Sequence, residues 1–562
     1  MPEKINRICC KIVRVLGSAF VGYLFLQGLF TICCIQRVTE KVYFVGNNAF
    51  RQLVGIGLAV GITALLCTDK IRGFLKRHGY SVVGMFVLAA AVFLGVWTMN
   101  TRFWYFGDME KIYQNAGMLL AGDYSGWQPG GYLYMWPHQN GMVLFVAFLL
   151  KFFSVDQSFL IFYGINILFY VIAVLAVAYS LRMLYPEKET HCIQTIMLIC
   201  YLPYAFFCMI LYGDVIGFSW GCLAIAAMLS YTRNHKAVRL FGSGVCMIFA
   251  IISKRNEMIV LAGLCILLFF DWLSAGKERG KRAFLAAVCL AAVLLGIRLP
   301  DIAIGQISGN RPEGNSMWAN IAMGLQEAED GAPGWYNCYE ENVFAENNYD
   351  TQKTGEEAKS SVKESLVKFA ENPAYAWRFF NLKLASEWNN PTFECFHIQN
   401  WRNTGLELSS LVKSAINDGG KINILLIYIF DMIQSVLLFG VLMYLIAADK
   451  ADLKQLLFVI LFLGGFLFFA VWEAKCRYTV PFFFLLIPYA FLGYRGLVES
   501  MKTYGRHFCK MYAGIAAILV LIVMIALSDA GWVHDSFKID RDTEDYYQYI
   551  HEYNSNFENL RF

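Results

Sequence analysis

The chain has 562 residues, of which 57% are hydrophobic and only 16% are charged, and its formal net charge is +4. A soluble protein of this length carries about a quarter charged residues, so the composition excludes an ordinary soluble enzyme. No glycine-rich phosphate loop, zinc-type cysteine pairing or basic nucleic-acid module stands out in the sequence. Long apolar runs recur from end to end, and the sequence predicts an all-α integral membrane protein.

These apolar runs predict about thirteen membrane-spanning helices. They lie at 12–34, 52–69, 81–99, 157–181, 193–211, 215–231, 239–253, 257–273, 283–298, 423–447, 454–472, 478–494 and 511–528. The first run follows basic residues, as in a signal peptide, but it continues to about Cys34 without a convincing cleavage site. We therefore expect it to remain as the first helix.

Positive charge in the short loops predicts the orientation of the helices, because cytoplasmic loops are enriched in lysine and arginine. The basic residues are Lys4, Arg7, Lys11, Arg14, Lys70, Arg72, Lys76, Arg77, Arg233, Lys236, Arg239, Lys277, Arg279, Lys281, Arg282, Arg495, Lys502, Arg506 and Lys510. If these loops are cytoplasmic, alternate loops and the C-terminal tail lie outside the cell membrane.

Three apolar segments separate the outer loop at 100–140 from Asp214, and this stretch tests the predicted topology. Both sites are expected outside, and three crossings cannot return the chain to its starting side. Met142–Phe153 is the shortest of the three segments. We expect it to form an interfacial helix, and the alternative is a short true span with another boundary misplaced.

The same pattern divides the chain into five regions. They are an N-terminal helix pair (1–80), a membrane core (81–298) with a large outer loop at 100–156, an extracytoplasmic insertion (299–422), C-terminal helices (423–528) and an extracytoplasmic tail (529–562). The insertion is polar, with amphipathic helical patterns near 355–371 and 374–388, and we expect it to be small and mainly helical. Its Cys338 and Cys395 could form a disulfide or remain two free thiols.

The first outer loop contains an acidic pair at the start of a predicted helix. Asp108 and Glu110 precede apolar residues that share one helical face, and carboxylates are favoured at a helix N-terminus. The same loop provides Trp104 and a Pro-His-Gln turn with His138 and Gln139. We interpret Asp108 and Glu110 as candidate catalytic acids; the alternative is an acid that only caps a surface helix.

A second acid and two basic clusters are also predicted on the outer side. Asp214 lies at the start of an apolar run, where it could pair with Asp108 as base and orienter or could cap a helix. The clusters contain Lys254 and Arg255, and Lys475, Arg477 and Tyr478. They could bind a phosphate or diphosphate, or their side chains could extend to lipid headgroups.

These motifs resemble the GT-C superfamily of membrane glycosyltransferases. The matching segments are GDMEK with Asp108, the turn WPHQNG, LYGD with Asp214, SKRNE with Lys254, and WEAKCRYTVP with Arg477. MWANIAMGL, GAPGWYN and FFNLKLASEWNNPTFE are similar to the loop of Gram-positive bacterial members grouped with dolichyl-phosphate mannosyltransferase-like enzymes (glycosyltransferase family 39-like). The resemblance covers about 81–494, and the first two helices look like an addition. The first motif is Asp-x-Glu instead of Asp-x-Asp, which leaves metal dependence open.

The resemblance implies a sugar transfer from a polyprenyl-phosphate donor to a cell-wall polymer, lipid or protein on the outer face of the cell membrane. Asp108 would act as base, with Asp214 and Glu110 as orienting acids or ligands of a divalent cation if one is used. Lys254, Arg255, Lys475, Arg477 and Tyr478 would bind the donor phosphate, and His138, Gln139 and Trp104 would line the cavity. No cofactor is otherwise required, and no nucleic-acid partner is expected.

Two other functions fit the same residues. A flippase for lipid-linked sugars would need the same cationic residues, although transporters usually place them near the membrane midplane. A ligase that moves a whole glycan from a polyprenyl-diphosphate would suit two basic clusters equally well.

Overall fold

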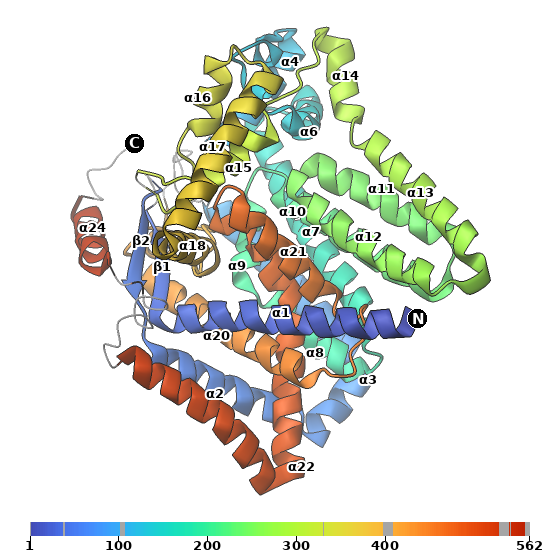
Figure 1. Cartoon of the computed structure of the whole chain (residues 1–562), viewed down its shortest axis with the longest axis vertical. Coiled ribbons are helices and arrows are strands. Elements are labelled where there is room, and N and C mark those ends of the chain that lie inside the picture. The colour runs from blue at the N-terminus through green and yellow to red at the C-terminus, as the bar shows by residue number, and fades with distance from the viewer. Residues whose placement is uncertain are drawn as a thin grey trace.

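The computed structural model describes residues 2–36, 40–101, 107–329, 331–396, 408–527, 539 and 541–556, and it is almost entirely helical (Figure 1). Among these residues, nine helices are long and apolar enough to cross a membrane, or ten if a bent pair is counted as one span. The nine contain α1 (Pro2–Phe30), α2 (Ala49–Leu66), α3 (Asp69–Thr101), α7 (Val155–Leu184), α10 (Asp214–Asn234), α12 (Met258–Leu273), α13 (Arg279–Gly296), α20 (Lys421–Ala447) and α22 (Val480–Leu527). The expected all-α, multi-pass membrane fold is confirmed.

The expected number of thirteen spans is not confirmed. α11 (Ala237–Ser253) and α21 (Leu457–Val471) are apolar but have only 17 and 15 residues. The expected span at 193–211 is the bent pair, in which α8 (Lys188–Ile199) meets α9 (Leu202–Ala205) and the 3₁₀ turn η3 (Phe206–Met209) at 55°. Pro203 in α9 cannot continue the hydrogen bonding of α8. The expected span at 511–528 lies outside the residues whose side chains are described.

A short β-hairpin follows α1, where the sequence had predicted helix up to residue 34. β1 (Thr31–Ile35) pairs antiparallel with β2 (Val42–Gly46), with Cys33 opposite Phe44. The β-branched and cysteine residues of β1 suit an extended strand as well as a helix, which explains why the predicted helix extended to residue 34. The C-terminal helix α24 (Thr543–Asn556) lies beside this hairpin (Figure 1). The Asp542 amide donates to the Phe44 carbonyl at 3.2 Å, and the Phe44 amide donates to the Asp542 carboxylate at 3.1 Å.

The N-terminal helix pair is fastened to α20 by a buried acid. Asp431, inside α20, accepts hydrogen bonds from Arg51 of α2 at 2.7 Å and from Asn47 at 3.0 Å. A carboxylate at membrane depth is costly unless it is paired. Asp431 therefore has the structural partner that its position requires.

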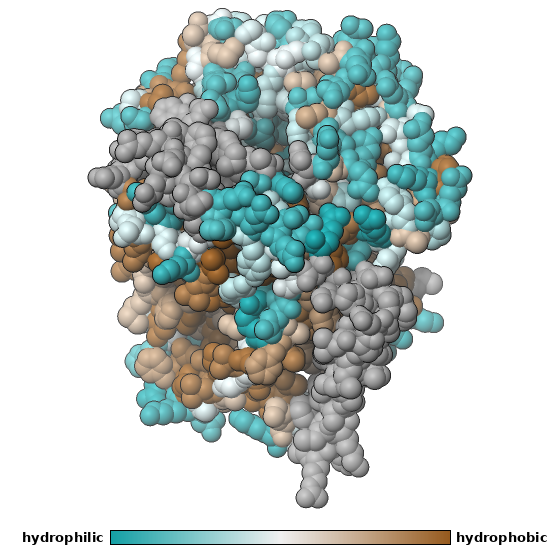
Figure 2. Space-filling model, turned by 90° about the vertical axis from the view of Figure 1, so that its left-hand side faces the viewer, coloured by the Kyte–Doolittle hydropathy of each residue, from teal (hydrophilic) through white to brown (hydrophobic). Residues whose placement is uncertain are grey.

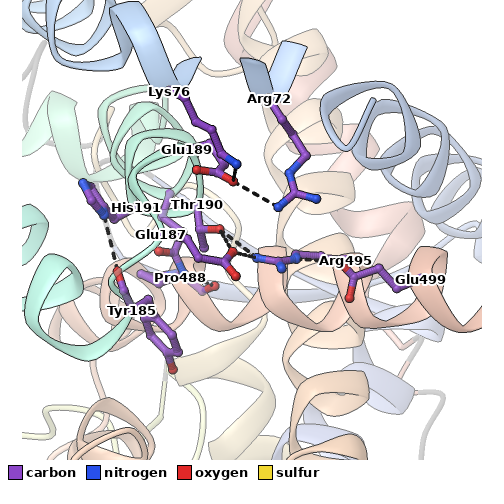
Figure 3. Close-up of polar contacts among 11 residues, drawn as sticks. Arg72, Lys76, Tyr185, Glu187, Glu189, Thr190, His191, Pro488, Arg495 and Glu499 are labelled. Carbon is purple, nitrogen blue, oxygen red and sulfur yellow. Dashed lines mark hydrogen bonds and ion pairs between the residues drawn. The ribbon is translucent and has the colours of Figure 1, made fainter. Parts of the chain in front are cut away.

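A network of charged side chains joins three helices at one end of the bundle (Figure 3). Arg72 of α3 pairs with the buried Glu189 of α8 at 3.0 Å, and Arg495 of α22 pairs with Glu187 at 2.6 Å. Arg72, Lys76 and Arg495 of this network are among the basic residues that the sequence analysis assigned to cytoplasmic loops.

The opposite end of α3 leads to the outer loop. Arg72 and Thr101 are 29 positions apart on this straight run of helix, which at about 1.5 Å per residue separates them by roughly 44 Å. Asp108 follows Thr101, so the charged network and the acidic motif lie at opposite ends of the bundle. Figure 2 shows hydrophilic residues covering the upper part of one face and hydrophobic residues gathering below them.

The outer loop and the insertion form the helices at this opposite end. They are α4 (Asp108–Ala121), η1 (Ser125–Trp127), α5 (Tyr132–Met135), η2 (Pro137–Gln139), α6 (Asn140–Phe152), α14 (Leu299–Ser308), α15 (Met317–Gly324), α16 (Tyr339–Glu346), α17 (Thr351–Glu371), α18 (Pro373–Trp388) and α19 (Ser410–Ile416). α17 and α18 match the two predicted amphipathic patterns. The segment expected at the interface is α6, a helix of 13 residues packed against α4, too short to cross a bilayer at normal thickness. Its interfacial position stays a prediction.

The insertion packs on both loops that contain the predicted motifs. Its Asn315 amide donates to the Met135 carbonyl at 2.9 Å. The buried ammonium of Lys383 donates at 2.6 Å to the carbonyls of Gly324 and Trp472. Because one segment contacts both loops, it fixes them relative to each other. Cys338 is exposed and Cys395 is buried, and both are free thiols.

Candidate active site

Four of the predicted residues meet at the end of the bundle that contains the insertion. Asp108 begins α4 and Asp214 begins α10, while Lys254 and Arg477 precede α12 and α22. The Arg477 Nη2 atom lies 3.9 Å from the Asp108 Oδ2 atom, and the Lys254 Nζ atom lies 2.9 Å from the Asp214 Oδ1 atom. All four residues lie at the N-terminal ends of these helices, so helices far apart in the sequence begin side by side.

Asp108 is held at the N-terminus of α4 with its carboxylate accessible. The predicted apolar face is confirmed, since Ile112, Tyr113 and Ala116 are buried. The Asp108 side chain remains 49% exposed. The Tyr132 hydroxyl donates to the Asp108 Oδ1 atom at 3.0 Å, which orients the carboxylate and leaves room for a second hydrogen-bond donor.

Asp214 and Lys254 are brought together by close backbone packing. A Cβ atom on Gly213 would stand 1.8 Å from the Ser253 carbonyl oxygen, and one on Gly217 would stand 2.8 Å from the Lys254 Cβ atom. Glycine is therefore required where α10 approaches the turn before η4 (Arg255–Glu257). The Asp214 Oδ2 atom is buried and has no hydrogen-bond partner among the described residues.

Two tyrosine rings separate the cationic groups of the site. The Tyr212 ring centroid lies 4.2 Å from the Lys254 Nζ atom and 5.8 Å from the Arg477 Cζ atom. The Tyr478 ring lies 5.4 Å and 5.6 Å from the same two groups. Cations are attracted to the faces of aromatic rings, so these tyrosines hold two positive charges close together.

The environment changes the pKa of two groups at the site. Burial lowers the pKa of Lys254, and the neighbouring Asp214 carboxylate opposes this shift. Desolvation by the surrounding protein, followed by the charge of Arg255, lowers the pKa of His138 to about 4. His138 is thus neutral at physiological pH, although its ring is open to solvent. Gln139, next to it, donates a hydrogen bond to the Tyr212 hydroxyl.

A pocket opens behind the ion pairs and changes from polar to apolar along its wall. Its polar lining contains Asp214, Lys254, Asn256, Glu257, Arg477 and Tyr478, and its apolar lining contains Phe218, Ile259, Val260, Phe469, Pro481, Phe482 and Leu485. The apolar residues come from the first turns of α10, α12 and α22 and from the end of α21. The arrangement suits a ligand with an anionic head and a hydrocarbon chain.

Other predicted residues are placed differently. The buried Lys475 pairs with Glu40 and, at 3.6 Å, with Glu394, so it faces the hairpin and not the pocket. Its expected role in binding the donor phosphate is not supported by this position. Glu110 accepts a hydrogen bond from Gln114 one turn further along α4.

Arg255 and Trp104 complete the predicted set. The Arg255 side chain is exposed and its charge acts on His138. It does not line the pocket with Lys254. Trp104 lies outside the described residues. Among the described residues, no group of three or more His, Cys, Asp or Glu side chains is arranged to hold a metal ion.

Three residues of the site were missed in the sequence. Tyr212 lies inside the LYGD segment and could have been included with Asp214. Tyr132 is one of several aromatic residues in its loop, and nothing in the sequence singles it out. Glu340, in the insertion, is buried near the site, and its charge is affected by Asp108.

Comparisons with known proteins identify no family. No family model matches the chain, and no curated protein matches it. Two solved structures of oligosaccharyltransferases from Archaeoglobus fulgidus, the first of them named AglB, are similar to it. The complex with an inhibitory peptide and a dolichol-phosphate has a TM-score of 0.41 at 12% identity, and the apo form has a TM-score of 0.40 at 14% identity. Each match covers 85% of this chain but only 60% of the archaeal protein.

Proposed function

We propose that this chain is a membrane glycosyltransferase that moves a sugar from a polyprenyl-phosphate donor to a cell-envelope acceptor on the outer face of the membrane. One observation carries the proposal. An accessible carboxylate, Asp108, lies 3.9 Å from Arg477, and Arg477 and Lys254 line a pocket whose remaining lining is largely apolar. This arrangement provides a base, a phosphate site and a lipid channel in one place.

The donor phosphate would bind between Lys254 and Arg477. The Arg477 Nε atom is buried without a hydrogen-bond partner among the described residues, and a guanidinium offers phosphate a planar pair of donors. The first isoprene units of the carrier would then lie against Phe218, Phe469 and Phe482, where burying apolar surface is favourable.

The reaction would be a single displacement. The oxygen of an acceptor hydroxyl attacks the anomeric carbon of the sugar, while its proton passes to the Asp108 carboxylate. The bond between the anomeric carbon and the phosphate oxygen breaks, and its electron pair remains on the phosphate. Lys254 and Arg477 stabilise the charge that develops there. Attack opposite the leaving group inverts the anomeric configuration.

Charge distribution supports an extracytoplasmic site. The basic network with Arg72 and Arg495 is at the other end of the bundle, and loops rich in arginine and lysine remain in the cytoplasm. The proposed site, the insertion and the hairpin would therefore face outward.

The proposal is tested by reconstituting the purified protein with radiolabelled polyprenyl-phosphate sugars and extracted envelope acceptors. We expect transfer by the wild type and a loss of about 10²- to 10⁴-fold in Asp108→Asn, the range for removing a general base. Asp123→Asn is the matched control, because Asp123 is an exposed aspartate of the same loop whose carboxylate accepts from the Ser125 amide. Movement of the donor across the bilayer without any transfer would instead identify a flippase and overturn the proposal.

A further inference from the structure

The proposed reaction leaves unused a buried acid that the insertion contributes. Glu340, in α16, is only 6% exposed, and its Oε2 atom has no hydrogen-bond partner among the described residues. A buried carboxyl oxygen without a partner is unfavourable and uncommon in folded proteins. Such a group indicates that a ligand completes its hydrogen bonding.

Backbone contacts hold Glu340 against the turn that follows Asp108 in the outer loop. The Asn315 side-chain amide donates to the Glu340 carbonyl at 2.6 Å, while the Asn315 backbone amide donates to the Met135 carbonyl at 2.9 Å. Further along α16, the Phe344 ring stacks on Tyr134 with centroids 6.1 Å apart. Glu340 is therefore fixed beside residues 132–137.

An aromatic pair lies between Glu340 and Asp108. The Tyr132 and Trp136 rings have centroids 4.9 Å apart, and both side chains are partly exposed. Tyr132 donates to Asp108 at 3.0 Å, and the Trp136 side chain lies near enough to Glu340 to lower the pKa of its carboxyl. Partly exposed aromatic faces flanked by carboxyl groups suit a sugar ring, which presents apolar C–H faces and hydroxyl edges.

The charged groups that act on Glu340 are carboxyls, whereas the groups that would bind the donor phosphate are cations. Burial, followed by the charges of Glu473, Glu341 and Asp108, raises the pKa of Glu340 to about 8. An anionic group beside Glu340 would face these carboxyls, since Arg477, the cation paired with Asp108, would be occupied by the donor phosphate. An uncharged, hydroxyl-rich group meets no such repulsion.

We infer that Glu340, Trp136 and Tyr132 form the acceptor subsite, and that the group bound there is an uncharged saccharide. The inference rests on the proposed glycosyltransferase function and names the class of its acceptor. Glu340 binds a hydroxyl of the acceptor sugar, the two rings support its face, and a second hydroxyl points to Asp108. Glu340 acts as a specificity-determining residue.

The test compares acceptors and variants in the reconstituted system. The acceptors are methyl hexopyranosides, an anionic glycerol phosphate trimer and a serine-threonine peptide. We expect transfer to saccharides, with an acceptor KM at least about tenfold higher in Glu340→Leu, the loss expected for one buried hydrogen bond to a ligand. Glu340→Gln, which keeps hydrogen bonding, should restore most of the affinity. Glu341→Gln is the control, because the Glu341 carboxylate accepts instead from the Tyr336 hydroxyl at 2.5 Å.

The outcomes separate this inference from the proposed function. Unchanged acceptor KM in Glu340→Leu, or preferred transfer to the glycerol phosphate or the peptide, would overturn the subsite while leaving the transferase intact. Calorimetric titration with the methyl hexopyranosides, without donor, gives a second readout. Saccharide binding that Glu340→Leu abolishes would support the subsite even if the wild type transferred no sugar, whereas no binding and no transfer would reject both.

Discussion

Replacing Lys254 with methionine separates the structural role of this residue from its proposed role in binding phosphate. The Lys254 and Asp214 side chains are 12% and 11% exposed, and their charged atoms lie 2.9 Å apart. Removing one partner of a buried ion pair costs about 3–5 kcal/mol, because the other charge is left uncompensated. Lys254→Met should therefore lower the free energy of unfolding of the protein in detergent by an amount in this range, which appears as a lower unfolding temperature.

The double variant Lys254→Met with Asp214→Asn distinguishes the structural role of Lys254 from its proposed role in binding phosphate. Neutralising Asp214 removes the uncompensated charge, so most of the lost stability should return. Donor binding should not return, because the cation for the phosphate is still absent. A charge-assisted hydrogen bond contributes about 1.5–3 kcal/mol, so we expect polyprenyl-phosphate affinity to stay roughly 10- to 150-fold below that of the wild type.

Two measurements check this reasoning: unfolding temperature, and equilibrium binding of a short-chain polyprenyl phosphate in detergent. Lys353→Met, on the exposed surface of α17, is the control for loss of one lysine charge. Recovery of full donor affinity in the stable double variant would refute the assignment of Lys254 to the phosphate site. Unchanged stability in Lys254→Met would refute the buried ion pair.

Three further predictions concern other residues of the site. Arg477→Ala should weaken donor binding more than acceptor binding, and equal donor affinity in a binding titration would remove Arg477 from the phosphate site. Burial raises the pKa of Glu340 in the folded protein to about 8, above the 4.5 of an exposed glutamate, so the folded protein should lose stability as pH rises from 4.5 to about 8. Glu340→Gln should flatten this dependence in thermal unfolding curves, and an unchanged curve would contradict it. Gly213→Ala places a Cβ atom 1.8 Å from the Ser253 carbonyl oxygen and should cost about 1–3 kcal/mol, whereas Gly57→Ala, with open space around it, should not.

The sequence predicted the site residues that lie next to the ends of apolar runs. Asp108, Asp214, Lys254 and Arg477 each adjoin such an end, and the charge alternation placed all four ends on one side. The helix α4 was also predictable, because an amphipathic pattern of 14 residues behind an acidic pair leaves little ambiguity. Its confirmed buried face anchors the helix that begins at Asp108.

Other features depend on contacts between distant parts of the chain. Lys475 and Arg477 are two positions apart and looked equivalent, but Lys475 points to Glu40, which is 435 residues away. Glu340 was not recognised, because one glutamate among many in a polar insertion has no local pattern. The hairpin at 31–46 was missed because its first strand continues an apolar helical run without a break in hydropathy.

The ion pair between Glu40 and Lys475 has a consequence for any shortened version of this protein. The N-terminal helices resemble an addition when the sequence is read alone, yet the hairpin that follows α1 neutralises a cation two residues before Arg477. A chain that begins at α3 would leave the buried Lys475 with Glu394 and the Trp335 ring as its remaining partners. A truncated protein should therefore retain α1 and the hairpin if the segment around Arg477 is to keep its charge balance.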